Sequence, residues 1–376
     1  MATDDDRRFM RRALELAAHG WGRVHPNPLV GAVVVRDGEV VGEGYHTAFG
    51  APHAEVEALR AAGERARGAT VYVTLEPCAH HGKTPPCTEA LVEAGVARVV
   101  FAAEDPGPEA GGGGARLRAA GVEVTEGVER GPARRQNSAF FHALEHPGCY
   151  VALKYGMSLD GRLAPRAGAR VAVTGPEAHG EVHRLRAGFD AIMVGGETAR
   201  VDDPSLTVRG AVTPIRPPVR VVLDPEGALK ADATLVRTAR DVPVMVVVAE
   251  DVMDGCRELE DAGVQVLGAP RVDGGLDLEA ALERLRETGI RSVFCEGGGR
   301  LGAALLAAGL VQRLYLFLAP VLYGGGVPAF PPTGRGIAGV TVDVQRHGGD
   351  VLLVVDLDEP EPDGGVGGTA TAAGDG

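Results

Sequence analysis

The sequence lacks a hydrophobic run long enough to cross a membrane. A membrane-spanning helix needs about 20 consecutive apolar residues, whereas residues 242–249, one of the longer apolar runs, number eight. The first twenty residues contain three aspartates and four arginines, and no apolar segment of the kind that a signal peptide carries. We therefore expect a soluble protein that stays in the cytoplasm.

Positive charge and cysteine are also scarce. Lys and Arg number 38 against 51 Asp and Glu, a formal net charge of −13, whereas proteins that bind nucleic acid usually carry a basic face. We therefore expect a small-molecule ligand and no nucleic-acid or membrane partner. The five cysteines are an odd number in a chain without a secretion signal, so metal-binding or core roles are better interpretations than a disulfide framework.

The order of apolar and turn-forming segments predicts an α/β domain at the start of the chain. A length of 376 residues favours two domains, because a typical domain has about 100–200 residues. Apolar spacing predicts a helix over 7–19, and the DG pair at 37–38 predicts a hairpin of 29–35 with 39–45. Further elements are expected as helices over 54–62, 88–94 and 115–120 and as strands over 70–75, 96–103 and 121–124. This alternation is typical of a three-layer α/β domain.

A second set of apolar strands begins at Tyr150 and predicts a second α/β domain. Its strands are expected near 150–155, 190–194, 219–223, 243–248, 291–295 and 313–319. The sequence thus divides into domains over 1–145 and 146–358 and a tail over 359–376. The tail is mostly Gly, Ala, Pro and acidic residues, so we expect it to be disordered.

Four residues in the first domain have the pattern of a catalytic zinc site. His53 and Glu55 form an HAE segment, and two cysteines that each follow a proline, Cys78 and Cys87, come later. One imidazole and two thiolates leave the fourth tetrahedral position of Zn²⁺ open for water, as in catalytic zinc sites. Zinc lowers the pKa of that water towards about 7, and Glu55 can carry its proton to the leaving group. Zinc deaminases share this combination of HxE and PC segments.

The local sequence supports Cys87 as a zinc ligand, but other interpretations of the His and Cys pattern remain open. Cys87 is expected at the N-terminus of its helix, where the helix dipole favours a thiolate. The cysteines could instead be core residues with HAE a chance tripeptide, or a zinc ion could only hold the fold. His80 and His81 lie between the thiols, and they are either alternative ligands, substrate contacts or parts of a solvated loop.

The two cysteines are nine residues apart, rather than three as in the plain deaminase motif, and this narrows the assignment. A close resemblance to the bifunctional riboflavin-biosynthesis deaminase/reductase family is carried by HPNPLVGAVVV (25–35), GEGYH (42–46), PHAEVEALRAAG (52–63) and VTLEPCAHHGKTPPC (73–87). It implies a cytidine-deaminase-like first domain that acts on a diaminopyrimidinone ribosyl phosphate. It also implies substrate contacts at Asn27, His46, His80 and Lys83, with Lys83 facing the phosphate or ribose. Without the resemblance, Asn27 would be taken as a turn residue between two prolines.

The resemblance continues through the second domain, over about residues 5–357 in all. It is carried there by LKYGMSLDGRLA (153–164), FDAIMVGGETARVDDPSLTVR (189–209) and CEGGGRLGAALLAAGLV (295–311). It implies a dihydrofolate-reductase-like domain that takes hydride from NADPH and converts the ribosyl group to a ribityl chain. The implied substrate contacts are Lys154, Arg170, Arg186, Leu206, Arg209 and Glu296, with Arg186 and Arg209 holding the phosphate. The implied cofactor contacts are Gly156, Ala172, Thr198, Asp202, Gly298, Gly299, Arg300, Leu301, Gly302, Ala303 and Ala304.

Two further features of the second domain bear on chemistry. Three glycines over 297–299, between a predicted strand and a helix over 301–308, let backbone N–H groups and a helix N-terminus approach a phosphate. We also expect Lys154 and Glu296 to act as a pair near the ribose, with Lys154 supplying a proton as hydride arrives.

The second domain departs from the family pattern at Arg170 and Ala172, where the family has serine and tryptophan. The loss of a large flat side chain at position 172 implies a reshaped pocket. Two interpretations follow: an active reductase, or a C-terminal domain that has drifted to another substrate or to an oligomerisation role. We expect a homo-oligomer formed through this domain. An RNA or free-nucleoside deaminase is disfavoured by the acidic charge and by the fused second domain.

Overall fold

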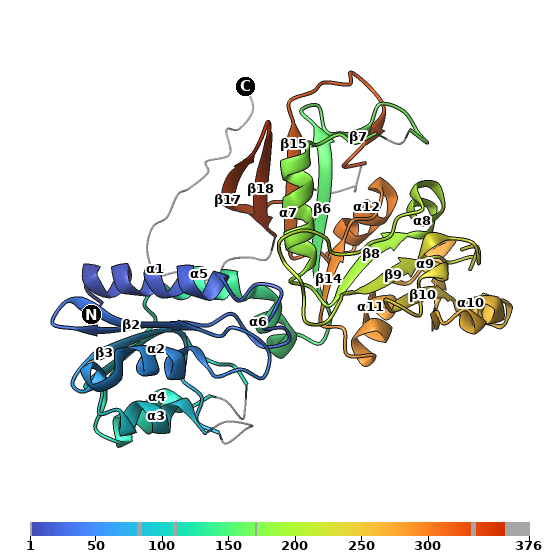
Figure 1. The fold of residues 1–376 in the computed structure, drawn as a ribbon. Helices are drawn as coiled ribbons and strands as arrows, with labels where there is room; N and C mark the ends of the chain where they lie inside the picture. Colours follow the sequence, from blue (N-terminus) through green and yellow to red (C-terminus); the bar gives the residue numbers. More distant parts are fainter. Residues whose placement is uncertain (1, 81–84, 108–110, 170, 332–335, 358–376) are drawn as a thin grey trace, which may run out of the picture.

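The computed structural model describes residues 2–80, 85–107, 111–169, 171–331 and 336–357, and it contains two large sheets (Figure 1). The N-terminal sheet has the strand order β2-β1-β3-β4-β5. Strand β1 is antiparallel to β2 and β3, whereas β3, β4 and β5 run parallel. Their bounds are Gly31–Arg36 (β1), Glu39–Tyr45 (β2), Thr70–Leu75 (β3), Arg98–Ala103 (β4) and Glu123–Glu126 (β5).

Helices cover both faces of this sheet because its strands are apolar on both sides. Along β1, Ala32 and Val34 pack on one face, and Val33 and Val35 pack on the other. The first face is covered by α2 (Ala54–Ala62), α3 (Cys87–Glu93) and α4 (Gly113–Ala119), and the second by α1 (Asp4–Ala18), α5 (Arg130–Gln136) and α6 (Ser138–Glu145). The expected three-layer α/β arrangement is therefore confirmed.

The C-terminal sheet has nine strands in the order β11-β10-β9-β8-β14-β6-β15-β18-β17. The strands from β11 to β15 in this order are parallel, and β18 and β17 are added antiparallel. The bounds are Tyr150–Ser158 (β6), Ala191–Gly195 (β8), Val219–Leu223 (β9), Val244–Ala249 (β10), Gln265–Ala269 (β11), Ser292–Cys295 (β14), Arg313–Ala319 (β15), Val340–His347 (β17) and Asp350–Asp356 (β18). Two short ribbons pair Arg271–Val272 (β12) with Gly275–Leu276 (β13), and Arg162–Ala164 (β7) with Val327–Pro328 (β16).

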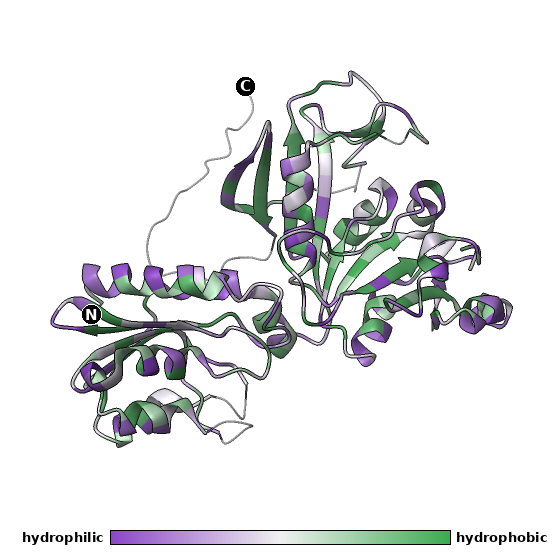
Figure 2. Ribbon diagram, in the orientation of Figure 1, coloured by the Kyte–Doolittle hydropathy of each residue, from purple (hydrophilic) through white to green (hydrophobic). Residues whose placement is uncertain are grey.

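This sheet is also enclosed by helices. One face packs against α11 (Leu278–Glu287) and α12 (Gly299–Ala307), and the other packs against α7 (Pro176–Arg186), α8 (Gly196–Asp202), α9 (Thr234–Arg237) and α10 (Arg257–Asp261). Figure 2 shows the strands mainly in the hydrophobic colour and the helices with hydrophilic stripes on their outer sides. Burial on both faces explains why the parallel strands read as continuous apolar runs in the sequence.

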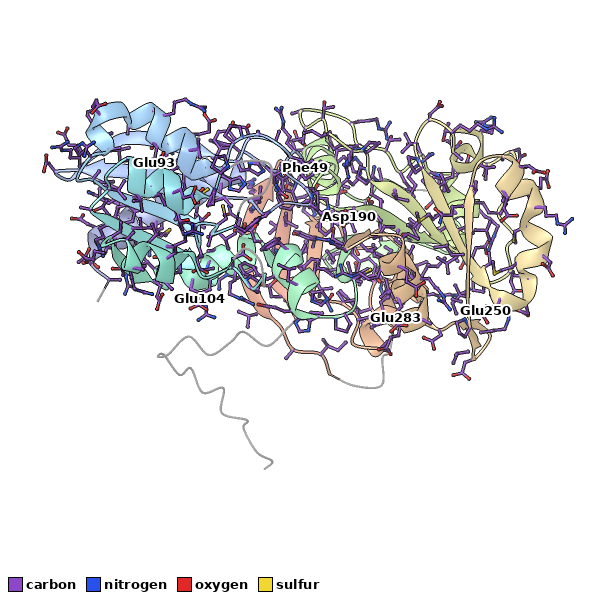
Figure 3. The ribbon with its side chains drawn as sticks, turned by 90° about the horizontal axis from the view of Figure 1, so that it is seen from below. Phe49, Glu93, Glu104, Asp190, Glu250 and Glu283 are labelled. Carbon is purple, nitrogen blue, oxygen red and sulfur yellow. The ribbon has the colours of Figure 1, made fainter. Side chains whose placement is uncertain are left out.

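The two domains contact each other where the parallel strands of the C-terminal sheet begin. Trp21 packs against Phe189, which precedes β8, and its Nε1 donates a hydrogen bond to the Arg184 carbonyl oxygen at 2.7 Å. Figure 3 shows Asp190 at this junction, near the middle of the molecule. Arg286 of α11 donates from Nη2 to the carbonyl oxygen of Ala143 at 2.6 Å. The carboxyl ends of the same strands therefore point away from the deaminase domain.

Most predicted elements are present. The predicted bounds of β2, α2, β3, β9 and β15 agree with the structure, and α6 ends at Glu145, where the first domain was expected to end. Strands β11, β17 and β18 were not predicted. Among the described residues, no helix is both long and apolar enough to span a bilayer. The tail over 359–376 lies outside the described residues.

Candidate functional site

Three loop and helix ends bring the predicted zinc ligands together. His53 is the N-cap of α2, Cys78 follows the end of β3 after Glu76 and Pro77, and Cys87 is the first residue of α3. Pro86 precedes Cys87 as the N-cap, so α3 cannot begin much earlier. The prediction that Cys87 starts its helix is confirmed, although the helix was expected from residue 88.

The three ligand atoms lie close enough to share one ion. His53 Nδ1 is 3.1 Å from Cys87 Sγ and 3.6 Å from Cys78 Sγ, and the three atoms all lie within 4.8 Å of one another. Hydrogen bonds from Cys87 and from His53 lower the pKa of the Cys78 thiol to about 4, in spite of its burial. The bond to Cys78 and burial raise the pKa of the Cys87 thiol instead. A bound cation would let both sulfurs be thiolates, and the donor set of one nitrogen and two sulfurs fits Zn²⁺.

Glu55 lies beside this cluster and is only 3% exposed. It is on the first turn of α2, and burial raises the pKa of its carboxyl group. Glu55 and His53 line the same cavity of about 560 Å³ as Cys78. A carboxylate that is not needed as a ligand therefore faces the space in which a substrate would meet the metal.

The cavity also contains three of the predicted substrate contacts, Asn27, His46 and His80. His46 is 3% exposed, and burial lowers the pKa of its ring. In the neutral ring, Nδ1–H donates to the Pro52 carbonyl oxygen at 3.1 Å, and Nε2 accepts from Asn27 Nδ2 at 3.2 Å. His46 therefore fixes the orientation of the Asn27 amide, which a simple turn residue would not need. The fourth predicted contact, Lys83, and also His81 lie outside the described residues.

Two acidic residues of the cavity were missed by sequence reasoning. Glu76 accepts hydrogen bonds from the backbone N–H of Gly114 at 2.8 Å and of Asp105 at 3.3 Å. Asp105 also lines the cavity, and burial raises its pKa. Glu76 is the first residue after β3, and Asp105 is the second residue after β4. A search for polar residues at strand ends could therefore have found both.

A second cluster lies at the carboxyl ends of the parallel strands of the C-terminal sheet, where ligands of open α/β sheets usually bind. Glu296 follows β14, and its side chain is 9% exposed. It pairs with Lys154 of β6 at 3.4 Å and with Arg186 of α7 at 2.5 Å. Burial raises the pKa of Glu296, but the two cations outweigh this effect and lower it to about 2. The structure thus brings the predicted Lys154–Glu296 pair together.

Arg186, which was predicted to hold the substrate phosphate, pairs with Glu296 in this structure. Its Nε and Nη2 atoms donate to the two carboxylate oxygens of Glu296 at 2.5 and 3.2 Å, and Nη1 donates to the Thr207 carbonyl oxygen at 2.8 Å. The guanidinium fork that was expected to hold a phosphate is therefore filled by Glu296. Arg209 is exposed, and its backbone N–H donates to Nδ1 of His183, a residue that sequence reasoning did not select.

The predicted glycine turn leads into α12 directly after this cluster. Gly298 is the N-cap of α12 without any side-chain cap, so the first N–H groups of the helix are available to a phosphate. The Gly298 N–H donates to Thr198 Oγ1 at 3.2 Å, which brings α8 beside the turn. A Cβ at Gly299 would lie 2.8 Å from the Pro328 carbonyl oxygen, and one at Gly302 would lie 1.8 Å from the Tyr155 hydroxyl. These two glycines thus also serve close packing.

The remaining predicted residues of this domain differ in how far they are buried. Leu206 is buried and has a φ of 48°, a left-handed conformation that is unusual for leucine. Gly156 is partly buried in β6, and Ala172 and Asp202 are exposed. On α12, Arg300 and Ala304 are exposed, whereas Leu301 and Ala303 are partly buried. Arg170 lies outside the described residues.

The fold and the two clusters define a class of protein: a zinc-binding nucleobase deaminase domain fused to a reductase-type α/β domain. Residues 3–103 match the cytidine and deoxycytidylate deaminase zinc-binding region, and residues 149–353 match the RibD C-terminal domain. The chain is 44% identical to the riboflavin biosynthesis protein RibD of Escherichia coli over 85% of this chain and 89% of the relative. It is 42% identical to RibD of Aquifex aeolicus over 87% and 90% of the two chains.

Two solved structures agree over nearly the whole chain. The RibD of Acinetobacter baumannii superposes with a TM-score of 0.80 at 38% identity, covering 94% of this chain and 98% of its own. A deaminase/reductase of Thermotoga maritima superposes with a TM-score of 0.80 at 34% identity, covering 94% and 99%. The chain therefore belongs to the RibD family of riboflavin biosynthesis proteins. It is a bifunctional enzyme, a zinc-dependent deaminase joined to an NADPH-dependent reductase, that acts on a small molecule.

Proposed function

We propose that residues 1–145 deaminate 2,5-diamino-6-(5-phosphoribosylamino)pyrimidin-4-one and that residues 146–358 then reduce its ribosyl group with NADPH. The deaminase assignment depends most on one observation: the ligand atoms of His53, Cys78 and Cys87 lie within 4.8 Å of one another, beside a cavity that His53, Cys78 and the buried Glu55 line. The identity of the Thermotoga maritima relative, a diaminohydroxyphosphoribosylaminopyrimidine deaminase and 5-amino-6-(5-phosphoribosylamino)uracil reductase, supports this choice of substrate.

In the deaminase half, this chain's own residues bind the ring and move the proton. Zinc held by the one imidazole and two thiolates would make a water molecule nucleophilic near neutral pH. Glu55 takes the proton of that water and delivers it to the departing amino group, which leaves as ammonia. Asn27, held by His46, hydrogen-bonds the pyrimidine ring, and His80 and Lys83 contact the substrate beyond it.

Exchange of Glu55 for glutamine tests this role. Glu55→Gln keeps the size of the side chain but cannot carry a proton, so ammonia release should fall about 10²- to 10⁴-fold. Zinc content and NADPH oxidation on the deaminated substrate should stay unchanged. Glu57→Gln is the matched control, because Glu57 lies on the same helix but pairs with Arg60 at the surface. Equal ammonia release by Glu55→Gln and the native chain would refute the assignment.

In the reductase half, we propose that Glu296 holds Lys154 and Arg186 at the substrate's ribose. Lys154 donates a proton to the ring oxygen as hydride reaches the sugar carbon, and Arg209 meets the phosphate. The free N–H groups at the start of α12 and the Thr198 side chain support cofactor binding there, and NADPH would supply the hydride. The proposed cofactor contacts are Gly156, Ala172, Thr198, Asp202, Gly298, Gly299, Arg300, Leu301, Gly302, Ala303 and Ala304.

Exchange of Lys154 for methionine tests the proton donor. Lys154→Met should lower the reductase kcat by about 10²-fold or more, while ammonia release stays unchanged. Lys230→Met, at an exposed lysine, is the control. An unchanged reductase kcat would remove Lys154 from the mechanism.

We also propose a cytoplasmic homo-oligomer assembled through the C-terminal domain. Strand β17 lies at the edge of the nine-stranded sheet, and Val340 and Val344 are 47% and 60% exposed there. An exposed apolar edge strand offers unpaired backbone N–H and C=O groups with which another chain can pair. The five free cysteines support a reducing compartment. Light scattering of Val344→Lys, compared with the native chain, should show a smaller mass if the proposal is right and an equal mass if it is wrong.

A further inference from the structure

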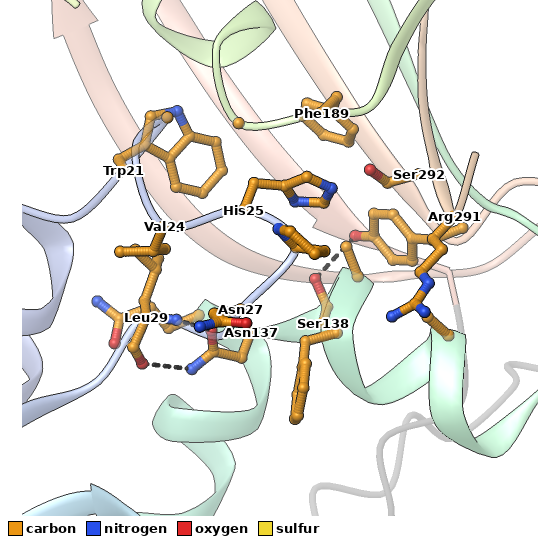
Figure 4. A pocket seen from close by; sticks show the side chains of 18 of the residues that line it. Trp21, Val24, His25, Asn27, Leu29, Asn137, Ser138, Phe189, Arg291 and Ser292 are labelled. Carbon is orange, nitrogen blue, oxygen red and sulfur yellow. Dashed lines mark hydrogen bonds between the residues drawn. The ribbon is translucent and has the colours of Figure 1, made fainter. Parts of the chain in front are cut away.

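The deaminase cavity has one wall that comes from the reductase domain. Arg291 is the residue before β14, and it lines the cavity together with residues of the zinc-ligand loop and of α2. A smaller cavity of about 70 Å³ at the domain junction shares Asn27, Phe140 and Arg291 with it (Figure 4). The space in front of the metal cluster therefore extends towards the junction, and Arg291 stands where the two cavities meet.

The charges around the cavity single out this arginine. The described lining residues include three carboxylates, Glu55, Glu76 and Asp105, and Arg291 is the single Lys or Arg among them. Arg216, also from the second domain, lies with its guanidinium carbon 5.3 Å from the ring centre of Phe49, another lining residue. Two cations of the reductase domain thus lie at or beside the wall of the deaminase cavity.

The backbone of Arg291 is held firmly while its side chain extends outward. Its N–H donates to Asp190 Oδ2 at 2.8 Å, and the same oxygen accepts from the Ser292 N–H at 3.0 Å. No hydrogen bond or ion pair engages its guanidinium group among the residues that the structure describes, and Arg291 is exposed. Figure 4 shows the side chain extending from β14 towards α6. An anchored, unpaired guanidinium fork is suited to bidentate binding of a phosphate.

We infer that Arg291 binds the phosphate of the substrate during deamination, so that the reductase domain supplies part of the deaminase site. This inference rests on the proposed function, which places the pyrimidine ring at the zinc and leaves a dianionic phosphate at the far end of the ribose. The carboxylates Glu55, Glu76 and Asp105 repel such a group from the inner part of the cavity. Arg291 attracts it to the side at which the junction opens.

The position of Arg291 confines its effect to the first reaction. Arg291 precedes β14, whereas Glu296 of the proposed reductase site directly follows that strand. A strand rises about 3.3 Å per residue, so the two residues are roughly 17 Å apart, at opposite ends of β14. The product of deamination must therefore leave this cavity before it is reduced, and the loss of Arg291 leaves the second reaction unaffected.

The test compares Arg291→Gln with Arg257→Gln, an equal loss of charge at an exposed residue of α10. Deaminase kinetics are measured by ammonia release from the phosphorylated substrate and from the same compound after removal of its phosphate. Arg291→Gln should raise KM for the phosphorylated substrate about tenfold with kcat unchanged, because the contact is equally strong in the ground and transition states. Arg291→Lys should recover part of the loss. On the dephosphorylated substrate, Arg291→Gln and the native chain should have the same KM.

Three results would overturn the inference. They are an unchanged KM of Arg291→Gln for the phosphorylated substrate, an equal rise for both substrates, and an equal effect of Arg257→Gln. Reductase kinetics on the deaminated product report whether the variant is folded, since they should match those of the native chain. If the native chain itself releases no ammonia, the proposed function fails, which is distinct from failure of the Arg291 contact.

Discussion

His25 of the deaminase domain pairs with Asp190 of the reductase domain. Asp190 directly precedes β8, and it also accepts hydrogen bonds from the backbone N–H groups of Arg291 and Ser292. Burial raises the pKa of the Asp190 carboxyl group, but the pairing with His25 and then the two backbone hydrogen bonds outweigh it and lower this pKa. Since Asn27 follows His25 by two residues, one carboxylate connects the substrate loop of the first domain to two strand ends of the second.

Loss of this pair should weaken substrate binding in the deaminase. In His25→Ala, Asp190 keeps its backbone partners, so the second domain stays folded, but the loop that carries Asn27 loses its anchor. We expect KM for the diaminopyrimidine to rise about three- to tenfold, the equivalent of one hydrogen bond. His179→Ala, at an exposed position of α7, is the control. If both variants show the native KM, the loop is held by other contacts.

Replacement of Gly302 by alanine should impair the reductase domain by overpacking. The added Cβ would lie 1.8 Å from the Tyr155 hydroxyl, so either the buried Tyr155 side chain or α12 must move. We expect the domain to lose about 1–3 kcal/mol of stability and its affinity for NADPH to fall, as measured by thermal unfolding with and without cofactor. Gly180→Ala in α7 meets nothing within 4 Å and should be neutral or stabilising. Equal stability of the two variants would contradict the close packing of α12.

Removal of one thiolate should abolish deamination alone. Cys78→Ser is expected to lower bound zinc from about one per chain to a small fraction, because a serine hydroxyl is a much poorer ligand than a thiolate. Metal analysis and ammonia release should fall together, while NADPH oxidation on the deaminated substrate persists. Cys256→Ala, in the core of the other domain, should keep its zinc. Full zinc content in Cys78→Ser would show that this residue is not a ligand.

The stability of the first domain should depend on pH through Asp6. This carboxylate is 1% exposed and accepts hydrogen bonds from Tyr72 at 2.9 Å and from Arg98 at 2.8 Å. Burial raises its pKa, but the Arg98 bond and the other hydrogen bonds lower it to a value below that of an unfolded chain. Since the folded pKa is depressed, the stabilisation is complete above pH about 4 and is lost as the pH falls further.

Urea unfolding at pH 7 and at pH 3 checks this expectation. Asp6→Asn should cost about 3 kcal/mol at pH 7, because the partly buried Arg98 loses its charged partner, and less at pH 3. Asp5→Asn is the control, since the side chain of Asp5 is 72% exposed. A difference between Asp6→Asn and the native chain that stays constant with pH would rule out the ionised carboxylate as the source of stability.

The extent of sequence-based prediction differs between the two sites. The zinc ligands and Glu55 could be placed because metal chemistry restricts both residue type and spacing, and the structure brings His53, Cys78 and Cys87 together. The pairing of Arg186 with Glu296 could not be foreseen. The sequence does not show which arginine binds a phosphate and which pairs with a carboxylate, and the two residues lie 110 positions apart. Arg291 carries no local signal, because its role depends on how the two domains dock.

The fold shows a similar division. The buried parallel strands were predicted because each is a continuous apolar run between turns. Strand β17 was missed because five of its eight residues are polar or charged, so it contains no continuous apolar run, and most of its residues are exposed. Its pairing with β18 comes from hydrogen bonds at the sheet edge, which leave little trace in hydrophobic periodicity.

The most direct test of the central claim follows both reactions of one purified chain in a single time course. The full-length enzyme receives the diaminopyrimidine ribosyl phosphate and NADPH, and ammonia and NADPH are measured in parallel. The account predicts that ammonia appears first and that NADPH oxidation follows until the two amounts are equal. Ammonia without NADPH oxidation would contradict the reductase assignment, and NADPH oxidation without ammonia would contradict the deaminase assignment.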